Sequence, residues 1–92
     1  MNTAGIDVSG RKSTVAVLRP FGEVVKLPFD VRHSAEDLAA LAEQLKSIEG
    51  ETRVVMKHTG RYYESIAKVL HEAGLYVSAV NLLLIKEYGN NS

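Results

Sequence analysis

The chain opens on a strand–turn–strand pattern whose decisive part, residues 5–18, reads GIDVSGRKSTVAVL. Ile6 and Val8 alternate with Asp7, which is the period of two expected of a half-buried strand over residues 3–8. The polar segment 9–12 contains a glycine and predicts a turn. A second strand is predicted over residues 13–19, which are largely β-branched and apolar.

A third strand is predicted over residues 23–29, where Val25, Leu27 and Phe29 alternate onto one face. Pro28 cannot donate a hydrogen bond to a neighbouring strand, so we expect this strand at an edge of the sheet. Three short strands in succession are typical of an antiparallel meander.

The pattern then changes to alternating helices and strands. Leucines at helical spacing predict a helix that begins after Ser34, a candidate N-cap with Asp37 as its capping partner, and ends before Gly50. The remaining elements are expected to be a strand over 52–56, a helix that opens at Thr59 or Gly60 and ends at Gly74, a strand over 75–80, and a helix from Asn81 through Tyr88.

The order of these elements predicts the fold. Strand–helix–strand crossovers give parallel neighbours with right-handed connections. Together with the meander, they predict an α/β fold with a mixed five-stranded sheet and helices packed on its faces. Three antiparallel strands followed by strand–helix–strand–helix–strand is the order of the ribonuclease H-like fold. No linker or repeat divides the sequence, so we expect one domain over residues 1–92.

Composition excludes several classes of function. The 92 residues include 11 basic and 11 acidic side chains, and this balance argues against a strongly cationic, self-sufficient nucleic-acid binder. The absence of cysteine excludes disulfides, thiolate nucleophiles and cysteine-ligated metals. No apolar stretch approaches the ~20 residues of a membrane span, and no signal peptide is readable. We therefore expect a cytoplasmic protein with no membrane partner.

Asp7 stands out as an acid in an apolar strand, just before a glycine-containing turn. A carboxylate buried at the end of a central strand loses hydration and needs a cation to offset that cost. Mg²⁺ is one candidate, because it prefers carboxylate and water oxygens. Two other interpretations stay open: Asp7 points to solvent, or it caps the following turn.

A second polar segment, residues 57–63 (KHTGRYY), follows the predicted fourth strand and enters a helix. Open sheets bind ligands at the carboxyl ends of their strands, and free N–H groups at a helix start favour an anion such as phosphate. Gly60 permits close approach of a backbone, Arg61 can add a charged contact, and Tyr62 can stack or hydrogen-bond. The alternative is a polar loop with an ordinary threonine cap and with Tyr63 in the core.

The three histidines do not predict a metal site. His33, His58 and His71 are separated by 25 and 13 residues, which fits no compact metal motif, and we interpret all three as surface residues. Arg11, Lys12 and Lys86 are either contacts to a phosphate backbone or solvated charges.

Three strings together resemble the N-terminal RuvC-like domain of the DEDD-type insertion-sequence transposases. They are residues 5–18, residues 54–70 (VVMKHTGRYYESIAKVL) and residues 74–89 (GLYVSAVNLLLIKEYG). The resemblance covers nearly the whole chain, in order and with matching spacing. Members of this family cut and join DNA. The resemblance therefore implies DNA and an element-encoded guide RNA as partners, and Mg²⁺ as the cofactor of the full-length protein.

The family holds its metal through four acids, Asp-Glu-Asp-Asp. Asp7 matches the first of them. The second falls in a string like M-E-x-T-G, where this chain has MKHTG at residues 56–60, so Lys57 occupies the position of the glutamate. The third and fourth acids lie in a segment like K-T-D-x-x-D, which this sequence does not reach before Ser92. The family's C-terminal domain with its nucleophilic serine is absent too, and Asn81-Leu82 replaces a usual Asn-Pro.

These departures predict a truncated RuvC-like domain, with its C-terminal part missing, that is catalytically silent and binds no metal. A two-metal site needs several carboxylates, and a lysine in place of one of them repels Mg²⁺. If the sheet brings Asp7 and Lys57 together, we expect an ion pair. Apolar surface left uncovered by the truncation favours a homo-oligomer. The candidate nucleic-acid contacts are Lys12, Thr59, Gly60 and Arg61.

Two alternatives stay open. One is a non-catalytic module for protein interaction or oligomerisation, which Lys57 and the short length favour. The other is half of an actin-like ATPase domain, in which the turn after Asp7 cradles phosphate. The turn at residues 9–12, SGRK, is less rich in glycine and threonine than phosphate hairpins of that class.

Overall fold

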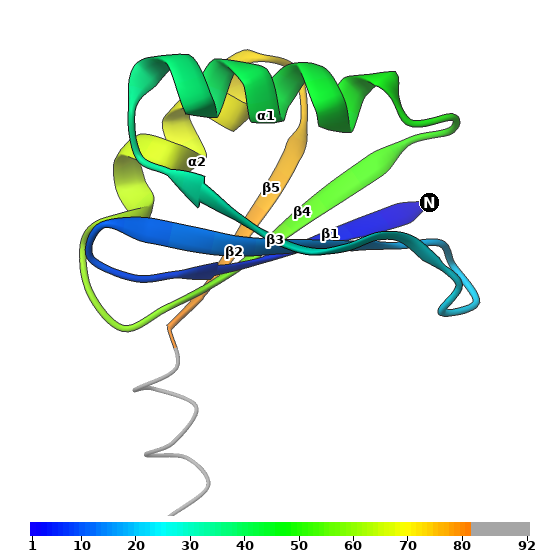
Figure 1. Ribbon diagram of the computed structural model, residues 1–92, viewed down its shortest axis with the longest axis horizontal. Helices are drawn as coiled ribbons and strands as arrows, with labels where there is room; N and C mark the ends of the chain where they lie inside the picture. Colours follow the sequence, from blue (N-terminus) through cyan, green and yellow to red (C-terminus); the bar gives the residue numbers. More distant parts are fainter. Residues whose placement is uncertain (82–92) are drawn as a thin grey trace, which may run out of the picture.

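The computed structural model describes residues 1–81, which form five strands and two helices (Figure 1). In chain order these are β1 (Asn2–Val8), β2 (Lys12–Leu18), β3 (Val24–Arg32), α1 (Ala35–Ser47), β4 (Thr52–His58), α2 (Tyr63–Glu72) and β5 (Tyr76–Asn81). No helix in this part of the chain is long and apolar enough to cross a membrane.

The strands form one mixed sheet in the order β3-β2-β1-β4-β5. β2 pairs antiparallel with both β1 and β3, whereas β4 pairs parallel with both β1 and β5. This arrangement confirms the predicted meander, the two crossovers and the edge position of the third strand.

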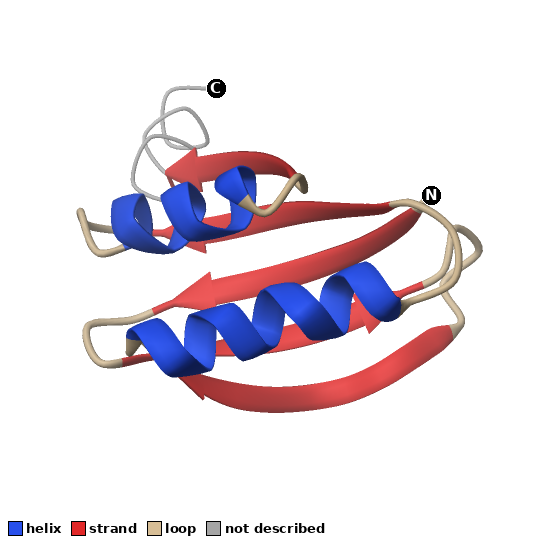
Figure 2. Ribbon diagram, turned by 90° about the horizontal axis from the view of Figure 1, so that it is seen from above, coloured by secondary structure: helices blue, strands red, loops and turns tan. Residues whose placement is uncertain are grey.

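Both helices cover the same face of the sheet (Figures 1 and 2). Seen from above, α1 lies over the side of the sheet formed by β1, β2 and β3, and α2 lies over β4 and β5 (Figure 2). The opposite face carries no helix within residues 1–81, and we call it the open face.

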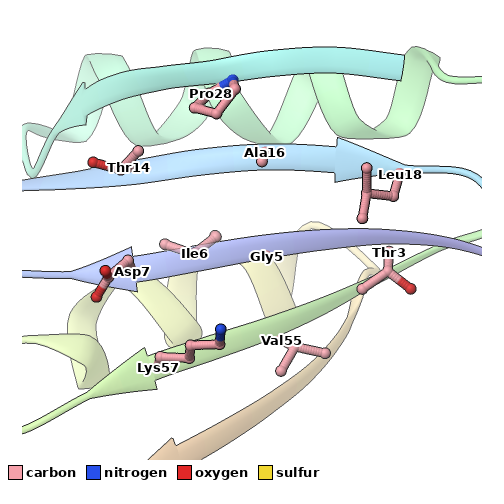
Figure 3. A pocket seen from close by; sticks show the side chains of 10 residues that line it. All are labelled: Thr3, Gly5, Ile6, Asp7, Thr14, Ala16, Leu18, Pro28, Val55 and Lys57. Atoms are coloured by element: carbon pink, nitrogen blue, oxygen red, sulfur yellow. The ribbon is translucent and has the colours of Figure 1, made fainter. Parts of the chain in front are cut away.

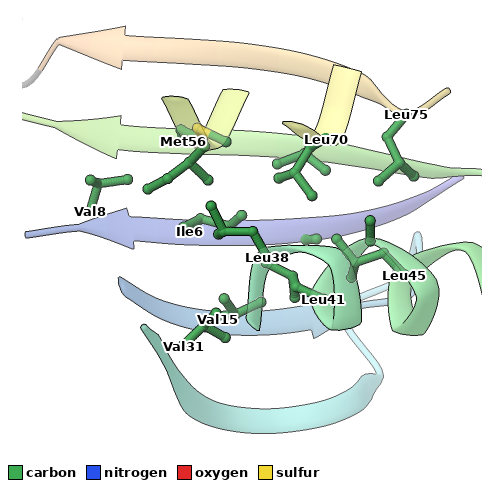
Figure 4. Packing of buried hydrophobic residues seen from close by; sticks show 14 of the residues in the cluster. Ile6, Val8, Val15, Val31, Leu38, Leu41, Leu45, Met56, Leu70 and Leu75 are labelled. Carbon is green, nitrogen blue, oxygen red and sulfur yellow. The ribbon is translucent and has the colours of Figure 1, made fainter. Parts of the chain in front are cut away.

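The core lies between the sheet and the two helices (Figure 4). It is built from every second residue of each central strand and from one stripe of each helix, as the two periodicities require. The largest of its fully buried side chains are Ile6, Leu45, Met56, Ile66, Leu70, Val15, Val17 and Val54. Burial of each such side chain stabilises the fold by about 1.5–3 kcal/mol.

Helix α1 begins where the sequence predicts. The side chain of Ser34 accepts a hydrogen bond from the backbone N–H of Asp37 at 3.2 Å, which satisfies one of the free donors of the first turn. Helix α2 ends as predicted as well, because Gly74 adopts a φ of 96°, which a glycine reaches without strain.

The start of α2 differs from the prediction. β4 continues two residues beyond Met56 to His58, and α2 begins at Tyr63 rather than at Thr59 or Gly60. Tyr62 provides no side-chain cap. A four-residue loop, 59–62, therefore separates the strand from the helix, and Gly60 is not at the helix N-terminus.

Strand β3 also departs from simple alternation. Val25 and Phe29 pack against the core as predicted, but Leu27 is 76% exposed. The pairing of β2 with β3 shifts register twice, because Val15 faces Phe29 whereas Val17 faces Lys26. The extra residues form an irregularity next to Pro28 and turn Leu27 out of the core.

The last predicted helix lies outside the described residues. Asn81 is the final residue of β5, so the expected helix cap is part of a strand.

Candidate functional site

Asp7 and Lys57 are neighbours on the open face. Asp7 pairs in parallel register with Lys57 across β1 and β4, and in antiparallel register with Thr14 of β2. Ile6 and Val8 are buried on the helical side, so Asp7 between them faces the other way. The register of β1 with β4 thus brings Asp7 and Lys57 side by side, which is the condition that the expected ion pair required.

A hollow of about 430 Å³ lies on the open face beside this pair (Figure 3). Its floor is the small residues Gly5 and Ala16, which are paired across β1 and β2. Apolar side chains form most of its wall, and the two charged groups that border it come from Asp7 and Lys57.

The expected ion pair between these two side chains is not formed. Among residues 1–81 the ion pairs are Lys12–Asp30 and Arg19–Glu23. In Figure 3 the Lys57 ammonium extends along the sheet, away from the Asp7 carboxylate. Asp7 is exposed, so water hydrates it and no cation is needed to offset burial. Of the interpretations left open for Asp7, the structure supports the one in which its side chain points to solvent.

The side chains around Asp7 do not fit a divalent metal. A hard cation such as Mg²⁺ requires several oxygen ligands, usually including more than one carboxylate in a two-metal site. Within residues 1–81, no group of three or more His, Asp or Glu side chains could hold a metal ion. The nearest strand neighbour of Asp7 on β4 is instead the cationic Lys57.

The loop that follows β4 is held by His58. The ring of His58 stacks on Tyr63 with 3.7 Å between centroids and 19° between planes, and its Nδ1 lies 3.0 Å from the carbonyl oxygen of Gly60. His58 is only 6% exposed, so its interpretation as a surface residue was wrong. Its position at the end of a strand that alternates into the core was the signal that could have placed it inside.

The other two histidines differ in their exposure to solvent. His71 is exposed on α2, as expected. His33 is half-buried, and its Nε2 lies 2.8 Å from the Oγ of the buried Ser13, so the surface interpretation does not hold there either.

Lys12 is neutralised by an acid that the sequence analysis missed. Its Nζ donates to the Asp30 carboxylate at 3.0 Å, and the Thr14 hydroxyl donates to the other oxygen, also at 3.0 Å. The Lys12 hydrogen bond, then the Thr14 hydrogen bond and the Lys12 charge, hold the pKa of Asp30 below its ordinary value. The signal was available only from the register, because residue 14 faces residue 30 across β2 and β3.

Thr59 and Arg61 are exposed in the loop after β4, together with Gly60. Tyr62, 61% exposed, places its ring edge 3.9 Å from where a Cβ would stand on either Gly10 or Gly60. The fold therefore brings the turn after β1 and the loop after β4 together at one edge of the sheet.

The sequence profile of a transposase family, the IS110-type DEDD transposases, matches residues 4–92. This match spans nearly the whole chain. The chain belongs to the DEDD transposase family.

Solved structures agree with this family at the level of the fold. The transposase chain superimposes on Thermus thermophilus RuvC with a TM-score of 0.64 at 20% identity, covering 95% of this chain and 66% of that one. T. thermophilus RuvC in complex with a Holliday junction substrate gives 0.61 at 18% identity, with 95% and 68% covered. A ROK family protein from Streptococcus pneumoniae TIGR4 in complex with sucrose gives 0.54 at 20% identity, with 88% and 34% covered.

The transposase chain thus spans about two thirds of the RuvC chains that it resembles and about a third of the ROK family chain. A comparison with curated proteins finds no significant match. The predicted ribonuclease H-like, RuvC-like fold is confirmed.

Proposed function

We propose that this chain serves DNA transposition as a RuvC-like domain that contacts nucleic acid and does not cleave it by itself. The observation that carries the proposal is the pairing of Asp7 with Lys57 on the open face. In the family that the sequence resembles, both positions hold metal-binding acids. Here one acid is retained and the other has the opposite charge.

Electrostatics explains why this pair disfavours a metal. Adjacent strands lie about 4.8 Å apart, so the Lys57 backbone is one strand spacing from that of Asp7. The positive charge of Lys57 on the neighbouring strand repels a divalent ion at Asp7, and a single exposed carboxylate does not offset that repulsion.

Nucleic-acid contact is supported by the loops at the carboxyl ends of β1 and β4. Thr59, Gly60 and Arg61 remain candidate contacts, because they are exposed at the edge where open sheets bind ligands. Lys12 is a weaker candidate, since Asp30 neutralises it. The partners we propose are DNA and the structured RNA of the element, in keeping with the family.

A second candidate function is a non-catalytic interaction module, and the open face favours it. Leu18 and Val55 border the hollow above Gly5 and Ala16 with no helix over them in residues 1–81. A second copy of the chain that covers this apolar surface would make a homo-oligomer. Sedimentation of the chain tests this: a Leu18→Asp variant is expected to shift any dimer to monomer, and a wild-type chain that is monomeric at high concentration contradicts it.

Binding of Mn²⁺, followed by electron paramagnetic resonance, tests the proposed function. The purified chain is expected to show no saturable site. The Lys57→Glu variant places a second carboxylate in register with Asp7, and we expect it to gain at least about tenfold in Mn²⁺ affinity, equal to about 1.4 kcal/mol. The matched double variant Asp7→Asn with Lys57→Glu is expected to lose that gain.

The same proteins are then assayed for Mg²⁺-dependent cleavage of DNA. The wild-type chain is expected to show none. A wild-type chain that binds Mn²⁺ saturably, with binding abolished by Asp7→Asn, or that cleaves DNA with the same dependence on Asp7, overturns the proposal of a silent domain.

A further inference from the structure

Although the net charge is zero, basic and acidic residues are concentrated at opposite ends of the strands. Loops connect the strands and helices at the two opposite ends of the strands, and we call each of these ends an edge. For each edge we count the residues of its three connecting loops and the one residue on either side of each loop. At the edge where β1, β3 and β4 end, these positions hold four basic residues and no acid. They are Arg11, Lys12, Arg32 and Arg61.

The opposite edge has the reverse charge. Its loops join β2 to β3, α1 to β4 and α2 to β5, and the same count gives one basic residue and four acids. They are Arg19, Glu23, Glu49, Glu51 and Glu72. The molecule therefore carries positive charge at one end of its strands and negative charge at the other, which is a distribution that orients it in the field of a polyanion.

The two faces of the molecule are also unequal. Ser13 and Val31 are buried against the helices, so Lys12 and Arg32, which pair across β2 and β3, face the open side. Lys57 lies on the open face as well, next to Asp7, and Asp30 lies on this face beside Lys12. The acids nearest this edge on the other side are Glu36, Asp37 and Glu64, in the first turns of α1 and α2.

Three of the arginines at the basic edge are available to a ligand. Lys12 is bound to Asp30. In contrast, no ion pair among the described residues includes Arg11, Arg32 or Arg61, and all three are exposed. Lys57 is exposed and unpaired by the same criterion. We call Arg11, Arg32, Lys57 and Arg61 the basic corner: the three arginines belong to the basic edge, and Arg32 and Lys57 lie on the open face.

The width of the basic corner matches a nucleic-acid strand. Arg32 on β3 and Lys57 on β4 are three strand spacings apart in the sheet order, which is about 14 Å. Phosphates of one strand of duplex DNA follow one another at about 3.4 Å along the helix axis, so this width spans about four of them.

We propose that the basic corner binds the phosphodiester backbone of a nucleic acid through side-chain cations alone, with Lys57 as one of them and without a divalent metal. This inference deepens the proposed function and rests on it. It replaces Lys12 by Arg32 among the candidate contacts, adds Arg11, and gives Lys57 a role as a phosphate ligand.

The acidic edge of a second copy is the other polyanionic partner to weigh. Exposed ion pairs between proteins contribute little and are screened by salt, whereas each neutralised phosphate releases a condensed counterion. Counterion release therefore favours nucleic acid over head-to-tail association of the chain, and such association is an alternative outcome of the test.

The test is the salt dependence of binding to fluorescent DNA and RNA duplexes of about 20 base pairs, measured by anisotropy between about 30 and 150 mM salt. The logarithm of the affinity falls with the logarithm of the salt concentration, with a slope of about −0.9 for each phosphate neutralised. Four contacts predict a slope near −3.6 for the wild-type chain. The Arg32→Glu variant is expected to weaken binding at least about threefold and to reduce the slope by about one.

Lys46→Glu is the matched control, because Lys46 is exposed in the last turn of α1 and the substitution changes the net charge equally. It is expected to leave the slope unchanged, and thermal melts check that both variants are folded. Binding of DNA alone or of RNA alone with this pattern supports the proposal and names the source of the phosphates. Equal effects of the two variants, or salt-sensitive self-association in place of binding, overturn it. The Mn²⁺ result stands independently, since it reports on the metal and not on this surface.

Discussion

At the scale of single residues, the proposed function depends on the sign of one charge, that of Lys57 beside Asp7. Lys57 lies one strand from Asp7 in exact register pairing, yet its ammonium makes no ion pair with that carboxylate in the described structure. Both side chains are exposed, and an ion pair between exposed groups would contribute only about 0–1 kcal/mol beyond their hydration by water. Lys57 therefore remains free to meet an anion from outside.

Asp30 gives a prediction for the dependence of stability on pH. Its pKa is lowered in the folded chain, so the hydrogen bonds from Lys12 and Thr14 stabilise the fold at pH values above the ordinary pKa of an aspartate. This contribution is lost as the pH falls through the lowered pKa. We expect the difference in melting temperature between wild type and Asp30→Asn to shrink from pH 6 to pH 3. A difference that grows toward low pH contradicts this sign.

The same substitution predicts a gain in nucleic-acid binding. Asp30→Asn removes an acid and releases the Lys12 ammonium, which then adds a fifth cation beside the basic corner. Affinity is expected to rise, with a salt slope steeper by about one. Asp37→Asn, which removes an acid from the first turn of α1, is the control. If it raises affinity as much, net charge and not the release of Lys12 is responsible.

At the scale of the elements, local signals predicted most boundaries and long-range contacts decided the rest. The N-cap at Ser34 and the helix end at Gly74 depend on residues close together in the sequence, and both are where the sequence predicted them. The start of α2 was missed because His58 extends β4 and stacks on Tyr63, a contact that no spacing rule contains. The exposure of Leu27 was missed because the irregular pairing of β3 with β2 depends on both strands.

In the candidate site, too, the features that depend on long-range strand pairing could not be predicted. The sequence raised the possibility that the sheet brings Asp7 and Lys57 together, and the register of β1 with β4 does so. The sequence could not predict the pairing of Lys12 with Asp30, which requires the register of an edge strand. The available cation Arg32 was missed for the same reason.

The Ser34 cap predicts a measurable loss of stability. Ser34→Ala removes the acceptor for the Asp37 N–H and is expected to lower the free energy of unfolding by about 1 kcal/mol. Ser34→Asp keeps an acceptor and serves as the control. Urea denaturation measures both, and equal loss in the two variants would show that the cap hydrogen bond does not stabilise α1.

At the scale of the whole molecule, one core layer between the sheet and two helices holds the fold. Ile66 and Leu70 of α2 and Met56 of β4 are fully buried in the same cluster, in which Figure 4 shows Leu70 and Met56. A chain of 92 residues buries a smaller fraction of its surface than a larger domain does, so each large core side chain counts heavily.

Truncation of one core side chain is therefore expected to come close to unfolding the chain. Ile66→Ala is predicted to cost about 2–5 kcal/mol, a large share of the about 5–15 kcal/mol typical of a folded domain. Ala67→Gly, at a half-buried position of the same helix, is expected to cost about 1 kcal/mol from helix propensity. Thermal melting distinguishes them, and similar losses would argue that α2 is not packed as described.

The separation of basic and acidic residues between the two edges is a feature of the described chain as a whole. It supports nucleic-acid binding at a site that we propose to be free of metal. The most direct measurement is the affinity of the wild-type chain for a DNA or RNA duplex in EDTA and in Mg²⁺ at matched ionic strength. If Lys57 and the arginines of the basic corner supply the cations, affinity in Mg²⁺ is no higher than affinity in EDTA, since no phosphate is held through a metal and Mg²⁺ competes with the side chains for the phosphates. A much tighter complex in Mg²⁺, with the increase lost in Asp7→Asn, contradicts the account.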